Sequence, residues 1–371
     1  MRKKSILIFG ITSVIGGTES YLRSLMNNLD LSKYDIDFMT IGEKKASLEE
    51  EFNQLFNDGR NHFFYPPNMK KKFVKSLLWL NRFYKEHEYD IIYMNVTSAA
   101  RIVYCNFALM DGKTKLITHN HCGSATSKLA GLNNYLFRHY TTKKSDIKLA
   151  CSDEAFYWGF TCPLSEGLII KNGINIDRFA YNKKFRDEIR RTYNIPKDAF
   201  VIGHIGRFEK EKNHKFLLNL CEKLDKKYYF LCAGEGTLKN IIQQEIIKKK
   251  LAGRFIILPF TEETEKLYSA MDVFCMPSFY EGLPIVAVEA QASGLPCIFS
   301  DTISKQANIC GNNYYLSIEN TLDWIDLISR ISEKRNNNKN LLKENGFDIK
   351  DTANTLERIF NELNNPEDKN E

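Results

Sequence analysis

Short apolar runs separated by longer segments with helical periodicity make up the first half of the chain. Most of these runs are continuously apolar, which is typical of strands that are buried on both faces of a parallel sheet. They are "SILIFG" (5–10), "DIDFMT" (35–40), "DIIYMN" (90–95), "KLITHN" (115–120) and "DIKLACS" (146–152). An amphipathic pattern at 18–29 predicts the first helix that covers this sheet.

The same pattern restarts after a polar segment at 169–199. The second series of runs is "AFVIGHIGR" (199–207), "YYFLCAG" (228–234), "RFIILPF" (254–260), "DVFCMP" (272–277) and "PCIFSD" (296–301). Helical patterns at 321–334 and 352–363 follow it. Strands that alternate with helices in this way predict parallel sheets.

Two such series predict an α/β architecture with two doubly wound, Rossmann-like domains, each binding ligands at the carboxyl ends of its strands. The 371 residues exceed what one core usually organises, which also favours two domains. We expect an N-terminal domain at 1–181 and a C-terminal domain at 182–350. Residues 351–371 are expected to form a helix that packs back on the N-terminal domain, followed by a tail.

Composition narrows the class of protein. The formal charge of +6 indicates an anionic ligand or membrane surface and does not require nucleic acid. No apolar run approaches the roughly 18 residues of a transmembrane helix, and "MRKKSILIFG" lacks a signal-peptide cleavage site, so it is expected to be a strand. Nine cysteines without a CxxC pair predict reduced thiols in a cytosolic protein, rather than disulfides or zinc ligands.

Two glycine-containing turns follow predicted strands. Gly16 and Gly17 precede a helix, where exposed backbone amides and the helix dipole favour an anion. Gly234 and Glu235 begin "GEG", which also allows a ligand to approach the backbone closely. A tight turn without a ligand is an equally good interpretation of each turn alone.

Arg207 and Lys212 stand in a strand-to-helix turn of the second series. A guanidinium fork and an ammonium point charge at the carboxyl end of a sheet suit a diphosphate. The alternative is a solvated charged loop without a ligand. After the third strand of this series, Pro259 and Phe260 could accommodate a nucleobase against the backbone, or Phe260 could be a core residue.

Two acids occur in the apolar segment "EGLPIVAVE". Glu281 is expected in a loop shaped by Gly282, Leu283 and Pro284, with Pro284 in the first turn of the next helix. Glu289 falls inside that helix among apolar neighbours, where a carboxylate needs hydrogen-bond donors such as hydroxyl groups. Those donors could belong to a ligand or to the protein itself.

These motifs together resemble the retaining nucleotide-sugar glycosyltransferases of glycosyltransferase family 4, which have the GT-B fold. The fold has two Rossmann-like domains facing each other across a cleft. The matching features are "GGTESYL" (16–22), "NGINIDRF" (172–179), "IGRFEKEKN" (205–213), "CAGEGTL" (232–238) and "EGLPIVAVE" (281–289), the last being the family's E-x7-E pattern. The chain looks most like bacterial capsular or exopolysaccharide glycosyltransferases.

The resemblance implies a role for each matching residue. Arg207 and Lys212 would hold the diphosphate of a donor, by default a UDP-sugar, in the C-terminal domain. Glu289 would bind the ribose hydroxyls, and Glu281 would lie near the transferred sugar. Gly17 would face the donor phosphates from the N-terminal domain, which would bind the acceptor.

A histidine of "LITHNHCGS" is also implied to face the donor sugar. Strand-length matching favours His121, but His119 stays an alternative. Both histidines could instead bond only to nearby backbone. The resemblance further implies retention of configuration, no metal ion and no cofactor besides the donor substrate.

The acceptor is less well defined, being a glycan or a lipid-linked saccharide. A basic amphipathic stretch at 68–87 could touch anionic lipid, or it could simply cover the first sheet. We therefore expect a cytoplasmic protein that contacts the inner face of the plasma membrane peripherally. The alternatives are a nucleotide-sugar epimerase or hydrolase of the same fold, and a non-catalytic nucleotide-sugar-binding subunit. A dehydrogenase is disfavoured because no GxGxxG follows a strand.

Overall fold

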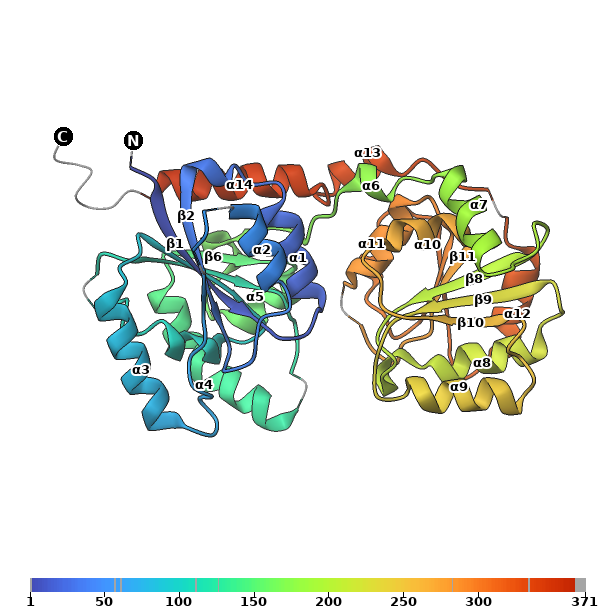
Figure 1. Cartoon of the computed structure of the whole chain (residues 1–371), viewed down its shortest axis with the longest axis horizontal. Helices are drawn as coiled ribbons and strands as arrows, with labels where there is room; N and C mark the ends of the chain where they lie inside the picture. Colours follow the sequence, from blue (N-terminus) through green and yellow to red (C-terminus); the bar gives the residue numbers. More distant parts are fainter. Residues whose placement is uncertain are drawn as a thin grey trace. The chain divides into compact units, whose positions relative to one another are not determined.

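A computed structural model describes residues 2–56, 58–60, 62–110, 112–125, 127–281, 283–332 and 334–363. The chain divides into two compact units (Figure 1). The first unit comprises Met1–Gly173 with Ile349–Glu371, and the second comprises Ile174–Asp348.

The first unit is built on a seven-stranded sheet with the order β3-β2-β1-β4-β5-β6-β7, in which every neighbouring pair is parallel. Its strands are β1 (Lys4–Ile11), β2 (Tyr34–Thr40), β3 (Phe63–Phe64), β4 (Ile91–Val96), β5 (Lys115–Asn120), β6 (Ile147–Ala150) and β7 (Leu168–Ile169). The continuous apolar runs predicted all of these except β3 and β7. Both are two-residue edge strands, too short to form a recognisable run.

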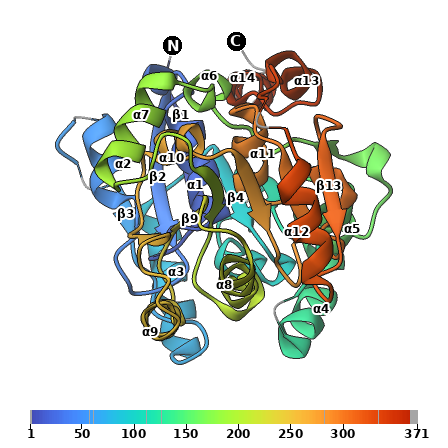
Figure 2. The same ribbon diagram turned by 90° about the vertical axis from the view of Figure 1, so that its right-hand side faces the viewer.

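Helices cover both faces of the first sheet. They are α1 (Gly17–Met26), α2 (Glu49–Phe56), α3 (Phe73–Glu86), α4 (Lys128–Lys144), α5 (Asp153–Gly159) and α14 (Ile349–Glu362), with 3-10 turns η1 (Leu31–Lys33), η2 (Ala99–Tyr104) and η3 (Leu164–Glu166). α1 contacts α14 on one face, whereas α3 and α4 lie on the opposite face (Figures 1 and 2).

The C-terminal helix α14 packs on the first unit. Lys4 Nζ donates to the carbonyl of Phe360 at 2.8 Å, and Lys33 forms an ion pair with Glu357 at 2.9 Å. Ile174 and Phe179, by contrast, lie in a buried apolar cluster of the second unit. The chain therefore passes between the units at 173/174 and 348/349, whereas the sequence pattern places the domain boundaries at 181/182 and 350/351.

The second unit is built on a six-stranded parallel sheet with the order β10-β9-β8-β11-β12-β13. Its strands are β8 (Phe200–Ile205), β9 (Tyr228–Ala233), β10 (Phe255–Leu258), β11 (Val273–Met276), β12 (Cys297–Ser300) and β13 (Asn313–Leu316). The edge strand β13 was not predicted, because the polar residues around "NYYL" give it no continuous apolar run.

The helices of the second unit also form two layers. They are α6 (Ile176–Phe179), α7 (Lys183–Thr192), α8 (His214–Lys223), α9 (Lys239–Lys248), α10 (Thr264–Ala270), α11 (Ile285–Ala292), α12 (Thr321–Arg330) and α13 (Lys339–Glu344), with 3-10 turns η4 (Lys210–Lys212) and η5 (Lys305–Ala307). Two buried clusters occupy the two faces of the sheet, one beneath α8, α9 and α12 and the other beneath α10 and α11. Two doubly wound α/β units, as predicted, are thereby confirmed.

Two absences follow within the described residues. No helix there combines the length and hydrophobicity needed to cross a bilayer. All nine cysteines, each of them described, are free of disulfides.

Candidate active site

The loop after β8 brings the two predicted cations to the carboxyl edge of the second sheet. Lys212 forms an ion pair with Glu281, which comes from the loop after β11. Each of these two side chains keeps only 16% of its surface exposed. Arg207 is more exposed and contacts Glu211 at 3.1 Å. The structure thus brings Lys212 and Glu281 together, while Arg207 lies at the solvent-exposed side of the same loop.

Asn213 explains how this loop turns into α8. Its backbone is left-handed (φ 55°, ψ 46°), a conformation that Asn tolerates better than most residues. Its side-chain amide donates to the carbonyl of Pro277 at 3.1 Å, which joins the loop after β8 to the end of β11. These strands are neighbours in the sheet, so Lys212 and Glu281 are held by backbone structure on both sides.

The two "GEG" glycines have a structural explanation. A Cβ on Gly234 (φ 148°) would lie 2.1 Å from the carbonyl oxygen of Gly206, and one on Gly236 (φ 156°) would lie 2.5 Å from that of Phe208. Glycine is therefore needed where the loop after β9 crosses the loop after β8. Backbone hydrogen bonds of 2.8 Å from Phe208 to Glu235 and from Leu238 to Phe208 fasten the two loops together.

Glu235 and Phe260 lie next to each other at the same edge. The Glu235 carboxylate pairs with Lys239 at 2.6 Å and accepts a hydrogen bond from the Phe260 amide at 3.3 Å. The Phe260 side chain is 47% exposed, so it is not a core residue. Pro259 before it is exposed as well.

The loop between Glu281 and α11 is only partly described, because Gly282 lies outside the described residues. Leu283 packs against the buried cluster beneath α10 and α11. Pro284 is the N-cap of α11 and has extended backbone (φ −77°, ψ 129°), so its expected place in the first turn was wrong by one residue. The helix begins at Ile285 because a backbone with ψ near 129° cannot be helical.

Glu289 meets a hydroxyl group of the protein. The Tyr268 hydroxyl donates to Glu289 Oε2 at 2.8 Å, whereas Oε1 accepts no hydrogen bond from any described residue. Burial raises the pKa of Glu289 to about 7, although Tyr268 and Arg178 act in the opposite direction. This carboxyl group is thus half-satisfied inside the protein and retains one oxygen for a further donor.

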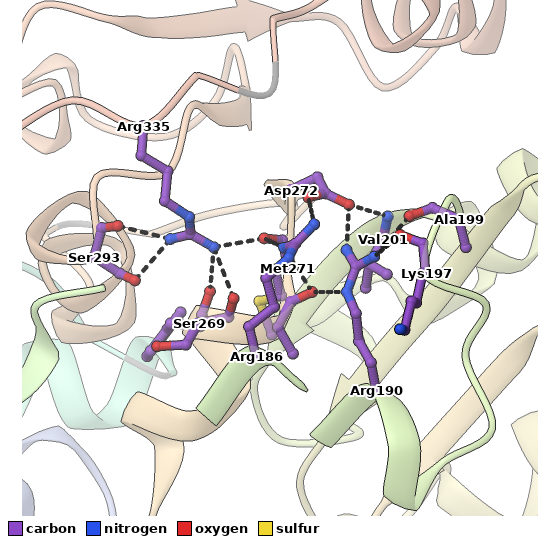
Figure 3. A network of polar contacts seen from close by, with 12 residues as sticks. Arg186, Arg190, Lys197, Ala199, Val201, Ser269, Met271, Asp272, Ser293 and Arg335 are labelled. Carbon is purple, nitrogen blue, oxygen red and sulfur yellow. Dashed lines mark hydrogen bonds and ion pairs between the residues drawn. The ribbon is translucent and has the colours of Figure 1, made fainter. Parts of the chain in front are cut away.

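Tyr268 was not singled out from the sequence, and neither was the arginine that anchors it. Arg335 donates to the carbonyls of Tyr268, Ser269 and Met271 at 2.6 to 3.0 Å, and also to Ser293 (Figure 3).

Beside Arg335, the Asp272 carboxylate is buried between Arg186 and Arg190, each 2.6 Å away. This network fixes the segment that carries Tyr268. No local pattern marks Arg335, because its partners lie more than 40 positions away.

In the first unit, the glycine turn is organised by a buried acid. Glu19 is only 2% exposed and accepts hydrogen bonds from the backbone amides of Thr12 and Gly16 at 3.1 Å each. It also accepts from the hydroxyls of Thr12 and Thr18. Gly16 is the N-cap of α1 and Gly17 is its first residue. Glu19 therefore holds the turn in place, a role that the motif "GGTESYL" did not reveal.

The two histidines of β5 differ in their remaining hydrogen-bond capacity. His119 is fully buried, with Nδ1 2.5 Å from the Tyr93 hydroxyl and Nε2 3.3 Å from the Ile170 carbonyl. His121 bonds through Nδ1 to Asn172 Oδ1 at 2.8 Å. Its Nε2 has no hydrogen-bond partner in the part of the chain that the structure describes. His121 alone of the pair thus has a ring nitrogen left for a ligand.

Both imidazoles are neutral near pH 7. Burial lowers the pKa of His121 to about 4 and that of His119 well below its usual value. With Nδ1–H donating to Asn172, the Nε2 atom of His121 is an acceptor for a hydroxyl group. Within the described residues, no three His, Cys, Asp or Glu side chains form a group that could hold a metal ion.

Comparisons with known proteins identify the family of the chain. The model of "Glycosyltransferase Family 4" matches residues 15–178, and that of "Glycosyl transferases group 1" matches residues 185–348. EpsF of Bacillus subtilis (strain 168), classed by name among the glycosyltransferases, is 30% identical over 368 residues and 93% of each chain. The O-antigen biosynthesis glycosyltransferase WclY of Escherichia coli is 26% identical, covering 89% of this chain and 94% of its own.

A solved structure shows the same fold. HepE of Anabaena, crystallised with UDP and glucose, superposes with a TM-score of 0.78 at 16% identity, covering 96% of this chain and 99% of its own. The two parallel-sheet units are those of the GT-B fold. Together with the two family models and the likeness to EpsF, this fold shows that the chain belongs to the glycosyltransferases of family 4.

Proposed function

We propose that the protein transfers a sugar from a UDP-sugar to a hydroxyl group of a glycan or lipid-linked saccharide, with retention of configuration and without a metal ion. The name of WclY supports a place in surface polysaccharide biosynthesis, and the complex of HepE with UDP and glucose supports a UDP-sugar donor. We assign donor binding to the second unit and acceptor binding to the first.

The observation that carries this proposal is the cationic loop at the carboxyl edge of the second sheet. Lys212 is held by Glu281 rather than left free, and Arg207 stands in the same loop. A donor diphosphate would compete with the two carboxylates for these cations. Because charge increases on the diphosphate as the glycosidic bond breaks, preorganised cations there stabilise the transition state more than the ground state.

The nucleoside would occupy the neighbouring part of this edge. The free Oε1 atom of Glu289 is an acceptor for a ribose hydroxyl, while Tyr268 holds the other oxygen. The exposed ring of Phe260 and the adjacent Pro259 would border the base. The backbone amide of Leu283, in the loop after Glu281, would lie near the sugar and the phosphates, whereas Gly282 lies outside the described residues.

The reaction follows from these groups. The acceptor oxygen attacks the anomeric carbon on the face from which the diphosphate departs. The bond between that carbon and the diphosphate oxygen breaks, and its electron pair stays on the diphosphate. The acceptor proton moves to the same diphosphate. His121, neutral and with Nε2 as acceptor, would orient a hydroxyl of the transferred sugar, and Gly17 would face the phosphates.

Peripheral contact with an anionic membrane forms part of the proposal, since it would bring the enzyme to a lipid-linked acceptor. The predicted basic stretch at 68–87 contains α3, whose outward side exposes Phe73, Val74 and Leu78. Its inward side buries Leu80 and Phe83.

Thermal-shift measurements with UDP-, GDP- and ADP-sugars test donor choice, because a ligand stabilises the folded state that binds it. We expect the largest rise in Tm with a UDP-sugar. The same measurement on the variant Lys212→Ala tests the role of this cation. Lys210→Ala is its matched control, since Lys210 is an exposed lysine of the same loop. No rise in Tm with any nucleotide sugar would overturn the proposal.

Product analysis then separates transfer from the alternatives. Incubated with donor alone, a transferase should leave nearly all of the donor intact, whereas an epimerase or hydrolase should convert it. With acceptor, NMR should show the anomeric configuration of the donor preserved in the product. Full activity after treatment with EDTA is expected, and a loss restored by a divalent cation would contradict the metal-independent mechanism.

A further inference from the structure

Helix α4 turns its polar residues inward. Asn134 and Thr141 are fully buried and hydrogen-bond to the segment around η2. Asn134 accepts from the Ala99 amide at 2.7 Å and donates to the Trp158 carbonyl at 2.7 Å. The Thr141 hydroxyl donates to the Ala99 carbonyl at 2.9 Å. These hydrogen bonds attach the helix to the sheet layer, together with Phe137, which packs against the buried apolar cluster of the first unit.

Its leucines and tyrosines point to solvent instead. Leu129, Leu132 and Leu136 are each between 55% and 69% exposed, and Tyr135 and Tyr140 are exposed as well. Positions three and four apart share one side of a helix, so these five side chains form one continuous strip. Scattered exposed leucines need no explanation, but a contiguous apolar strip marks an interaction surface.

The charges of α4 indicate what covers this strip. Its 17 residues, "KLAGLNNYLFRHYTTKK", contain Lys128, Arg138, Lys143 and Lys144 and no acidic residue. Arg138 stacks over Tyr135 at 4.9 Å, so this cation stays beside the apolar strip. An exposed apolar strip on a helix whose charged residues are all cations is complementary to an anionic lipid surface, with leucines among the acyl chains and cations among the headgroups.

A second exposed apolar group lies on the same side of the sheet. Phe73, Val74 and Leu78 of α3 are all more than half exposed, and Lys71 and Lys75 beside them are exposed too. Both helices lie on the face opposite α1 and α14 (Figures 1 and 2). The geometry points to α4 as the main membrane-docking surface of this protein, with the first turns of α3 as an accessory contact. This inference rests on the membrane contact proposed above and is independent of the proposed sugar transfer.

Vesicle sedimentation with the full-length chain tests it. We expect binding to vesicles of about 30% phosphatidylglycerol in phosphatidylcholine and little binding to pure phosphatidylcholine. About 0.5 M NaCl should release the protein, because an ionic strength well above physiological screens the attraction between the cations and the lipid headgroups. Leu132→Ser/Leu136→Ser should weaken binding about tenfold or more, because each leucine loses buried apolar area. Lys143→Gln/Lys144→Gln should also weaken it by about tenfold.

Matched controls come from the second unit. Ile247→Ser/Leu322→Ser removes two apolar side chains that are more exposed than Leu132 and Leu136, and Lys183→Gln/Lys184→Gln removes two exposed lysines. Both controls should bind vesicles as the wild type does. All four variants change surface positions, so unchanged Tm values and unchanged UDP-sugar thermal shifts should show that the fold is kept.

Three results would overturn the proposal. The first is wild-type protein that does not bind anionic vesicles. The second is α4 variants that bind them as tightly as the wild type. The third is a wild-type dimer in sedimentation velocity that the leucine variant converts to a monomer while vesicle binding stays unchanged, since the strip would then be covered by a second copy.

Discussion

The carboxyl edges of the two sheets carry different chemistry. The edge of the second unit presents charged side chains in partly exposed pairs, Lys212 with Glu281 and Arg207 with Glu211. The edge of the first unit presents the neutral imidazole of His121. The acid of the first edge, Glu19, has both oxygens occupied by its own loop.

This difference has a physical reason. Burying a charge is costly unless it is paired, whereas a neutral imidazole can be buried at little cost when it keeps a hydrogen bond. The second unit therefore keeps Arg207 near solvent and pairs the mostly buried Lys212 with Glu281, so that each cation can exchange a carboxylate for a phosphate. The first unit can bury its imidazole rings, because a neutral ring orients a hydrogen-bonding partner without adding a charge. We expect loss of charge in the second unit to have the larger effect on catalysis.

The largest effect should come from Lys212→Ala. Removing this cation leaves Glu281 unpaired beside the expected diphosphate, so stabilisation is lost and repulsion is added. By analogy with the loss of one preorganised electrostatic group, kcat/KM should fall about 10²- to 10³-fold. Steady-state kinetics with Lys210→Ala as control checks this, and equal rates for the two variants would contradict it.

The next largest effect should separate the two histidines. His121→Ala removes a group with an unused ring nitrogen, so kcat should fall about 30-fold, as expected for an aligned hydrogen bond of about 2 kcal/mol. His119→Ala removes a buried group with both ring nitrogens bonded, so it should lower the free energy of unfolding by about 2 kcal/mol. Urea denaturation and single-turnover rates distinguish these outcomes; the reverse pattern would assign the ligand contact to His119.

A smaller effect concerns pH and Glu289. The pKa of its carboxyl group is about 7 in the free protein, and only the ionised form can accept a ribose hydroxyl at Oε1 while Oε2 accepts from Tyr268. Binding should therefore lower this pKa, so that affinity for UDP-glucose rises about tenfold between pH 6 and pH 8. Calorimetry should show this rise for the wild type and a flat, weaker profile for Glu289→Gln. Both proteins keep the charged neighbours Arg178 and Glu265, and a rise that persists in the variant would exclude Glu289 as its source.

The smallest effect should come from Tyr268→Phe. This change removes the hydroxyl that holds Glu289 Oε2, while the buried ring stays in place. Loss of one hydrogen bond of about 1 kcal/mol should weaken UDP-glucose binding about fivefold. Tyr229→Phe is the control, because the Tyr229 hydroxyl makes no hydrogen bond within the described residues. Equal affinities for these two variants would show that Tyr268 does not position Glu289.

Much of the fold could be predicted because burial on both faces makes a strand continuously apolar. β1, β4 and β8 were found in this way within one or two residues. The edge strands β3, β7 and β13 could not be found, since short or half-covered strands leave no such run. Helix α4 shows the limit of pattern reasoning: leucines at helical spacing normally face a core, but here hydrogen bonds of Asn134 and Thr141 orient them outward.

The candidate site was predictable residue by residue but not contact by contact. Arg207, Lys212, Glu281 and Glu289 were named from motifs, and the structure places all four in the second unit. That Lys212 meets Glu281, and Tyr268 meets Glu289, could not be predicted from spacing. The role of Glu19 was likewise hidden inside a matching motif.

The sequence by itself determined the two parallel α/β units and the positions of the charged loop residues, because periodicity and glycine placement are local properties. Only the tertiary structure decided which groups meet, which histidine keeps a usable nitrogen and which helix face meets solvent. Those choices depend on strand order: β8 lies beside β11, so loops 69 positions apart share one edge. Local pattern fixes what a residue can do, and the neighbour brought by the fold determines what it does.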